Sequence, residues 1–205
     1  MKILIFIYAL MMSLAHGGNE VGNGGDVIVC KDNKVMLLDY HEAKDYGFDI
    51  NLKEDDVGYR PVLLNIISEF KKIDSKLADQ YLKRLNEIDI EINFKDSVDL
   101  VDIPDSYHVS LPKGCELKQV AIRLKEKRNG KQFVIDKDLW RKLDTGHQAG
   151  LILHEIIYEH FLFLGEKNSK KARYMNGLIS HIGSGNKLKI SYKELLRDRE
   201  IPIYR

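Results

Sequence analysis

The sequence predicts an α+β domain in which antiparallel β-hairpins pack with a long central helix and a C-terminal helix hairpin. Two observations support this fold class. Short β-type runs bounded by turn residues lie in the first two thirds of the chain, and helical patterns dominate the last third. Because the two kinds of run do not alternate regularly, they favour an α+β domain over a βαβ fold.

The amino terminus has the pattern of a secretory signal peptide over residues 1–15. Lys2 precedes the apolar run Ile3–Met12, and Ser13–Ala15 has the small-x-small spacing that signal peptidase cleaves. The apolar run is too short for the ~20 residues that a membrane-spanning helix needs. We therefore expect a periplasmic or secreted protein that is not an integral membrane protein after cleavage, with an uncleaved anchor as the alternative.

Residues 16–26 are rich in glycine and predict a flexible lead-in to a single α+β domain over residues 27–205. That length suits one domain with its own core. The glycine run Gly17–Gly25 is not a P-loop, because no Gly-Lys-Ser/Thr follows it. A backbone nest for an anion is an alternative interpretation of the same run.

The first regular elements are expected directly after this lead-in. Val27–Cys30 and Val35–Leu38 are short β-type runs around turn residues, which is typical of a hairpin. Asp39–Gly58 is acidic and lacks a clean period, so it is predicted as a loop with at most a turn of helix. A long helical pattern then begins at Pro61, and a break near residues 74–75 divides it into two helices.

Further strands are expected in the middle of the chain. Ile88–Phe94 alternates apolar and acidic residues, and Val98–Ile103 follows it. Leu117–Leu124 and Gln132–Ile135 flank Asn129-Gly130, a dipeptide that favours the tight turn of a hairpin. These runs supply the remaining strands of the predicted fold.

Two helices are expected at the carboxyl end of the chain. Asp138–Leu164 has a helical pattern with an interruption near residues 145–146, and Gly165 suits its C-terminal cap. Ser169 suits the N-cap of the next helix, whose apolar face runs from Ala172 to Ile182. The short link between them predicts an antiparallel helix hairpin.

Composition excludes one class of partner and indicates one covalent link. Lysine and arginine number 32 and aspartate and glutamate 31, a balance that argues against nucleic acid as a partner. The two cysteines, Cys30 and Cys115, are 85 positions apart. In an oxidising compartment two cysteines predict a disulfide, with two buried thiols as the alternative.

The segment Leu151–Leu164 carries the candidate chemistry. It resembles the H-E-x-x-H motif of zincin metallopeptidases, with His154 and Glu155 in place and Tyr158 at the second histidine position. The resemblance implies a zinc-dependent hydrolase in which His154 is a metal ligand and Glu155 is the catalytic general base. A neutral phenol is a poor zinc ligand, so Tyr158 breaks the motif.

The other histidines of the helix pair are not well placed to replace the missing ligand. His147 lies seven residues from His154, ~10.5 Å along a helix axis. His160 projects from the opposite flank of its helix, and His181 is predicted to point outward from the next one. The sequence therefore gives zinc no complete ligand set.

A buried polar cluster is the favoured interpretation of the same residues. We expect Glu155, Tyr158 and Glu159 to lie with His154 on one helix and to face Arg173 and Asn176 on the next. Such a cluster would serve a structural or binding role without a cofactor. Glu155 and Glu159 are also an i,i+4 carboxylate pair, a spacing that a glycosidase could use.

Three short elements resemble a group of secreted bacterial proteins without a known activity. They are G-N-G-G-D at Gly22–Asp26, L-H-E-x-I-Y at Leu153–Tyr158, and R-x-x-N at Arg173 and Asn176. The resemblance implies that the glycine run and the helix pair form one unit. The overall expectation is an extracytoplasmic domain with a binding or structural role and an unknown partner. A metal-dependent hydrolase is the alternative.

Overall fold

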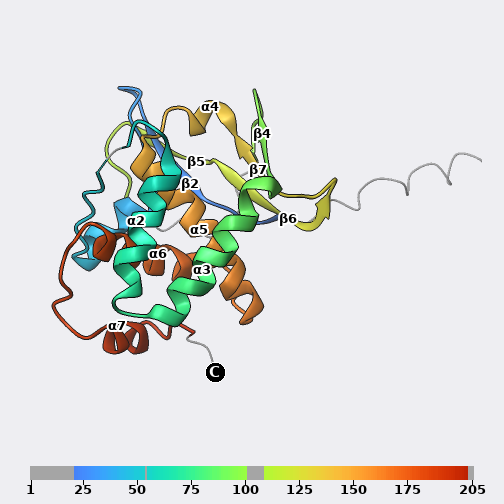
Figure 1. The fold of residues 1–205 in the computed structure, drawn as a ribbon. Helices are drawn as coiled ribbons and strands as arrows, with labels where there is room; N and C mark the ends of the chain where they lie inside the picture. Colours follow the sequence, from blue (N-terminus) through green and yellow to red (C-terminus); the bar gives the residue numbers. More distant parts are fainter. Residues whose placement is uncertain (1–20, 54, 101–108, 203–205) are drawn as a thin grey trace, which may run out of the picture.

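The computed structural model describes residues 21–53, 55–100 and 109–202. The predicted signal peptide and the first part of the glycine-rich lead-in, residues 1–20, lie outside this range. The chain is an α+β fold (Figure 1). Its elements in chain order are β1 (Val21–Asn23), β2 (Asp26–Cys30), β3 (Val35–Leu37), α1 (Leu38–Ala43), η1 (Lys44–Tyr46), α2 (Tyr59–Lys71), α3 (Ser75–Ile88), η2 (Asp89–Glu91), β4 (Ile92–Lys95), β5 (Cys115–Gln119), β6 (Ala121–Arg128), β7 (Lys131–Asp136), α4 (Lys137–Trp140), α5 (Thr145–Phe163), α6 (Lys170–Gly183) and α7 (Tyr192–Asp198).

The described strands form two small sheets. One has the order β1-β6-β7-β4 and the other β3-β2-β5. The predicted hairpins are confirmed as antiparallel pairs, β2 with β3 and β6 with β7. In the second hairpin Asn129 and Gly130 have φ of 51° and 76°, the left-handed conformation that the predicted tight turn requires. In contrast, β4 and β7 pair in parallel, whereas the sequence predicts only antiparallel hairpins.

Two short links join one sheet to the other, and they meet at Gly25. Between β1 and β2 the chain passes through Gly24 and Gly25, and between β5 and β6 through Val120. The carbonyl oxygen of Gly25 accepts hydrogen bonds from the backbone N–H groups of Val120 and Ala121 at 3.0 and 3.2 Å. A Cβ on Gly24 would lie 1.9 Å from the carbonyl oxygen of Ala121. Glycine is therefore required for the strands to approach this closely.

The expectation of a flexible lead-in through residue 26 is wrong for its last six residues. Residues 21–23 form β1, which pairs with β6, and Gly24, Gly25 and Asp26 are buried. The β-type alternation of this stretch is short and interrupted by glycine, so composition alone indicated flexibility. Its order comes from pairing with a strand about 100 positions later in the chain.

Helices α1, α2, α3 and α6 pack against α5, whose residues from Ala149 to Glu159 are all buried. The predicted division of the long helical pattern is confirmed, because Asp74 caps α3 by accepting a hydrogen bond from the backbone N–H of Leu77 at 3.0 Å. The helix hairpin of α5 and α6 is also as predicted, with Gly165 at φ 93° after α5. No helix in the described part of the chain has the length and apolar character needed to cross a membrane.

Three further expectations are corrected. The strand predicted over Ile88–Phe94 begins only at Ile92, because α3 continues to Ile88 and a 3-10 turn follows. The strand predicted over Val98–Ile103 is not present in residues 98–100, and the rest lies outside the described residues. Segment 39–58, predicted as a loop with at most a turn of helix, contains most of α1 followed by η1.

The predicted disulfide is present. Cys30 and Cys115 stand opposite each other in the β2–β5 pair and are bonded. The bond joins two strand ends that 85 positions of sequence separate.

Candidate functional site

The centre of the helix layer holds a buried polar cluster formed by Asp39, Tyr40, His154, Asn176 and Ser180. Nδ1 of His154 lies 2.8 Å from Oδ2 of Asp39, and the side-chain amide of Asn176 donates to the same oxygen at 2.6 Å. The amide of Asn176 also donates to the carbonyl oxygen of Gly150 at 2.9 Å. One carboxylate on α1 is therefore held by donors from both α5 and α6.

The cluster continues from Asn176 to the hydroxyl of Tyr40. The Ser180 hydroxyl donates to the Asn176 side-chain oxygen at 3.4 Å and lies 3.0 Å from the Tyr40 hydroxyl. A Cβ on Gly150 would lie 2.3 Å from the Tyr40 hydroxyl oxygen. Glycine at position 150 thus makes room for Tyr40 to pack against α5.

Electrostatics favour a charged His154 within this cluster. Burial by itself disfavours the imidazolium, but the negative charge and the hydrogen bond of Asp39 outweigh that effect and raise the pKa of His154 to about 9. The side chains of His154 and Asp39 are only 1% and 0% exposed. A buried ion pair of this kind is costly to break, because either partner alone would be an uncompensated buried charge.

Glu155 lies next in sequence but has a different role. Its Oε1 accepts a hydrogen bond from the backbone N–H of Gly25 at 2.8 Å. Glu155 therefore joins α5 to the link between β1 and β2, where the chain passes from one sheet to the other. Burial raises the pKa of Glu155 to about 6, although the charge of His154 and the hydrogen bond from Gly25 oppose the shift. The glycine run and the helix pair are therefore in direct contact.

Of the remaining predicted cluster residues, two belong elsewhere. Arg173 reaches α1, where its Nε lies 2.7 Å from the carboxylate of Glu42. Glu159 pairs with Arg84 on α3 and with Arg123 on β6. Tyr158 is buried, with its ring centroid 6.0 Å from that of His154. The structure thus joins Asn176 to His154 through Asp39, and it places Arg173 beside Glu42 and Glu159 beside Arg84 and Arg123.

The other histidines contact different parts of the structure. His147 lies 2.8 Å from the Asp144 carboxylate, and His160 lies 3.1 Å from the Tyr81 hydroxyl. His181 was expected to point outward, but it is buried beside Phe48, with Nδ1 2.9 Å from the carbonyl oxygen of Asp49. Within residues 21–53, 55–100 and 109–202, no group of three or more His, Cys, Asp or Glu side chains is arranged to hold a metal ion.

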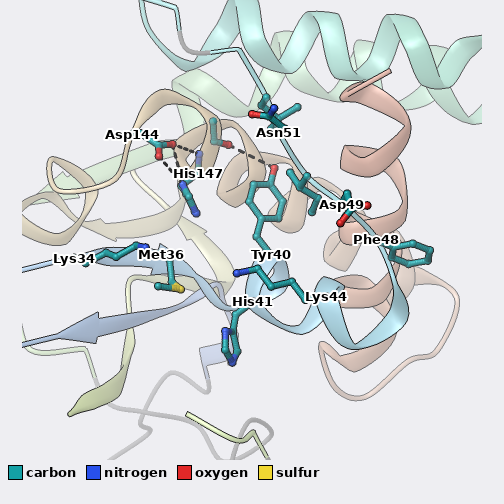
Figure 2. Close-up of a pocket in the computed structure, with 13 residues that line it drawn as sticks. Lys34, Met36, Tyr40, His41, Lys44, Phe48, Asp49, Asn51, Asp144 and His147 are labelled. Carbon is teal, nitrogen blue, oxygen red and sulfur yellow. Dashed lines mark hydrogen bonds and ion pairs between the residues drawn. The ribbon is translucent and has the colours of Figure 1, made fainter. Parts of the chain in front are cut away.

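A pocket of about 540 Å³ opens beside α1, and we call it the α1 pocket (Figure 2). Its walls come from the β2–β3 hairpin, from α1 with the segment that follows it, and from the start of α5. The lining residues are Lys34, Met36, Tyr40, His41, Lys44, Phe48, Asp49, Ile50, Asn51, Leu52, Asp144, Gly146 and His147. Tyr40 belongs to both the pocket and the buried cluster.

The sequence did not identify α1, which carries Asp39, Tyr40 and Glu42. One signal was present: Leu37, Tyr40 and Ala43 recur at a spacing of three and are all buried. A helix of six residues is too short to show a periodic pattern clearly against an acidic background. Sequence patterns therefore point to His154 and Arg173 as buried polar residues but do not indicate their partners, Asp39 and Glu42.

The site belongs to an α+β fold with a buried polar cluster behind an open pocket. No family model, no curated protein and no solved structure matches this chain.

Proposed function

We propose that this chain is an extracytoplasmic ligand-binding module and that the α1 pocket is its binding site. One observation carries the proposal: α1 supplies Asp39 to the buried cluster, and it supplies Tyr40 and His41 to the pocket. The cluster thus fixes the helix that forms one wall of the pocket. A pocket with a fixed wall binds with a smaller loss of conformational entropy.

The packing around α1 supports a pocket that is already formed without a ligand. Donors from α5 and α6 hold Asp39, and Arg173 holds Glu42 one turn further along. A Cβ on Gly177 would lie 3.0 Å from the Cβ of Ala43, so α6 approaches α1 closely as well. These contacts restrain α1 along most of its length.

Burial favours this proposal over the zinc hydrolase. A hydrolase would need His154 and Glu155 to reach a substrate, yet they are 0% and 1% exposed. Asp39 occupies Nδ1 of His154, and the N–H of Gly25 occupies one oxygen of Glu155. Neither residue lines the α1 pocket.

An extracytoplasmic location is supported by the pattern of residues 1–15 and by the Cys30–Cys115 disulfide. Expression of the full chain in a bacterium tests it. The intact mass of the exported protein should correspond to cleavage after Ala15, with one disulfide. A cytoplasmic protein of full-length mass with free thiols would contradict the location.

Binding is tested by screening the mature protein, prepared without a His tag, against a mixed library of small fragments by ¹H–¹⁵N NMR. We expect shift changes that group around Tyr40, Lys44 and His147. The control is a different hollow of the surface, lined by Lys187 and Tyr192 among others. A screen without binders, or with binders only at that hollow, would contradict the proposal. Metal analysis of the same sample distinguishes the binding module from the alternative, a zinc hydrolase. The hydrolase should carry about one zinc per chain and the binding module none.

A further inference from the structure

Two lysines reach the α1 pocket from different elements. Lys34 comes from the turn before β3, and Lys44 is the first residue of η1, directly after α1. Figure 2 shows their side chains entering from opposite sides, with both nitrogens directed toward the space beside Met36 and Tyr40. Neither ammonium group has an ion pair or hydrogen bond with another residue in the described part of the chain. By comparison, Lys71 and Lys171 lie 2.6 and 2.8 Å from carboxylate oxygens.

The two carboxylates in the wall do not neutralise these lysines. Asp144 accepts a hydrogen bond from the backbone N–H of His147 at 2.7 Å, and both its oxygens lie 2.8 Å from the ring nitrogen Nδ1 of the same residue. Figure 2 shows the Asp49 carboxylate on the Phe48 side of the pocket, away from Lys34. The positive charge of the pocket is therefore available to a ligand.

The rest of the wall is apolar or aromatic. Met36, Ile50 and Leu52 contribute aliphatic surface, and the rings of Tyr40 and His147 pack with their centroids 5.4 Å apart. A volume of about 540 Å³ suits a small molecule. The wall thus offers charge at one point and apolar surface around it.

We propose that the α1 pocket binds a small organic carboxylate that has an apolar or aromatic body. The carboxylate lies between Lys34 and Lys44, where two cations can each donate a charge-assisted hydrogen bond. The body packs against Met36 and Leu52. This inference rests on the proposed binding function and adds the chemical class of the ligand.

Phenylacetate and its neutral isostere phenylacetamide provide a direct test by ¹H–¹⁵N NMR titration of the mature protein. We expect phenylacetate to bind about ten-fold more tightly, because only it can form charge-assisted hydrogen bonds with the lysines. The Lys34→Gln/Lys44→Gln double variant should lose this preference. Lys187→Gln, which removes a lysine from the other hollow, is the matched control and should retain it. Melting curves of the variants verify that each is folded.

The outcomes separate this inference from the proposed function. Equal binding of the acid and the amide in the α1 pocket would overturn the carboxylate specificity and leave the binding function standing. An unchanged preference in the double variant would overturn the role of the two lysines. If neither compound binds but a neutral fragment occupies the pocket, the inference is wrong and the binding function holds. If no fragment binds there, the proposed function itself is wrong.

Discussion

Oδ2 of Asp39 lies 2.8 Å from Nδ1 of His154, although 115 positions separate the two residues in the sequence. The contact joins α1 to α5, and Asn176 on α6 donates to the same oxygen. Three helices thus meet at one carboxylate. The His154-Glu155 pair, which resembles a metallopeptidase motif, makes structural contacts here. His154 pairs with Asp39 on α1, and Glu155 accepts a hydrogen bond from the backbone of Gly25 between β1 and β2.

The first prediction concerns the buried ion pair. His154→Ala should lower the free energy of unfolding by about 3–5 kcal/mol at pH 7, because the buried Asp39 carboxylate would lose its charged partner. Urea unfolding followed by circular dichroism measures the change. His147→Ala is the control on the same helix, since His147 is partly exposed and its removal should cost less than about 1 kcal/mol. Similar losses for the two variants would contradict the account.

The second prediction concerns pH. The pKa of His154 is raised from 6.5 to about 9, so the folded state binds a proton more tightly than the unfolded state does. This contribution is complete below pH 6.5 and is lost as the pH rises toward 9. The pKa of Glu155 is raised from 4.5 to about 6, so stability should also fall between pH 4.5 and 6.

Urea midpoints measured from pH 4.5 to 9.5 test both parts of this pH dependence. In His154→Gln the decline toward pH 9 should largely disappear. The decline that begins near pH 4.5 should persist and extend to higher pH, because the charge of His154 no longer lowers the pKa of Glu155. A wild-type midpoint that rises between pH 6.5 and 9 would show that folding does not raise the pKa of His154.

The third prediction concerns Gly24, in the link between β1 and β2. Gly24→Ala places a Cβ 1.9 Å from the backbone carbonyl oxygen of Ala121, which cannot move aside as a flexible side chain could. The variant should lose about 3 kcal/mol or more of stability. Gly165→Ala serves as the control, because its left-handed φ costs about 1–2 kcal/mol but no atom lies within 4 Å of the new Cβ. Equal melting temperatures for the two variants would argue against close approach at Gly24.

The fourth prediction concerns the disulfide. Cys30 and Cys115 close a loop of 85 positions, for which the chain-entropy model gives a stabilisation of about 4–5 kcal/mol. The Cys30→Ser/Cys115→Ser variant should therefore unfold at a clearly lower urea concentration. Reduction of the wild type should produce the same shift, and addition of a reductant to the double variant should have no effect. An unchanged midpoint on reduction would mean that the bond adds little.

Local patterns were sufficient to predict much of the fold. The Asn129-Gly130 turn, the division of the long helical pattern at Asp74 and the Gly165 cap each depend on a few neighbouring residues. The order of residues 21–26 depends instead on pairing with β6, far away in the sequence. A glycine-rich run looks flexible until its distant partner is known.

The candidate site shows the same limit. His154 and Asn176 were identified because a polar residue on an apolar helix face needs a partner when it is buried. Asp39, their shared partner, lies on a short helix in an acidic segment, where the sequence has no clear period. Arg173 was identified as buried for the same reason, but which acid it meets depends on the position of α1. Helix spacing can select residues, and the tertiary packing decides their partners.

The most direct test of the account is whether the buried cluster controls the pocket through α1. Asp39→Asn removes the charge that anchors α1 and leaves every pocket residue in place. Leu85→Ala is the control, because it destabilises a buried position on α3 without contact to the pocket. The measurement is the Kd of the strongest pocket-binding fragment, determined by NMR at a temperature where all variants are folded. We expect Asp39→Asn to weaken binding about ten-fold and Leu85→Ala to bind as the wild type does. Wild-type affinity in Asp39→Asn would show that the cluster and the pocket are independent.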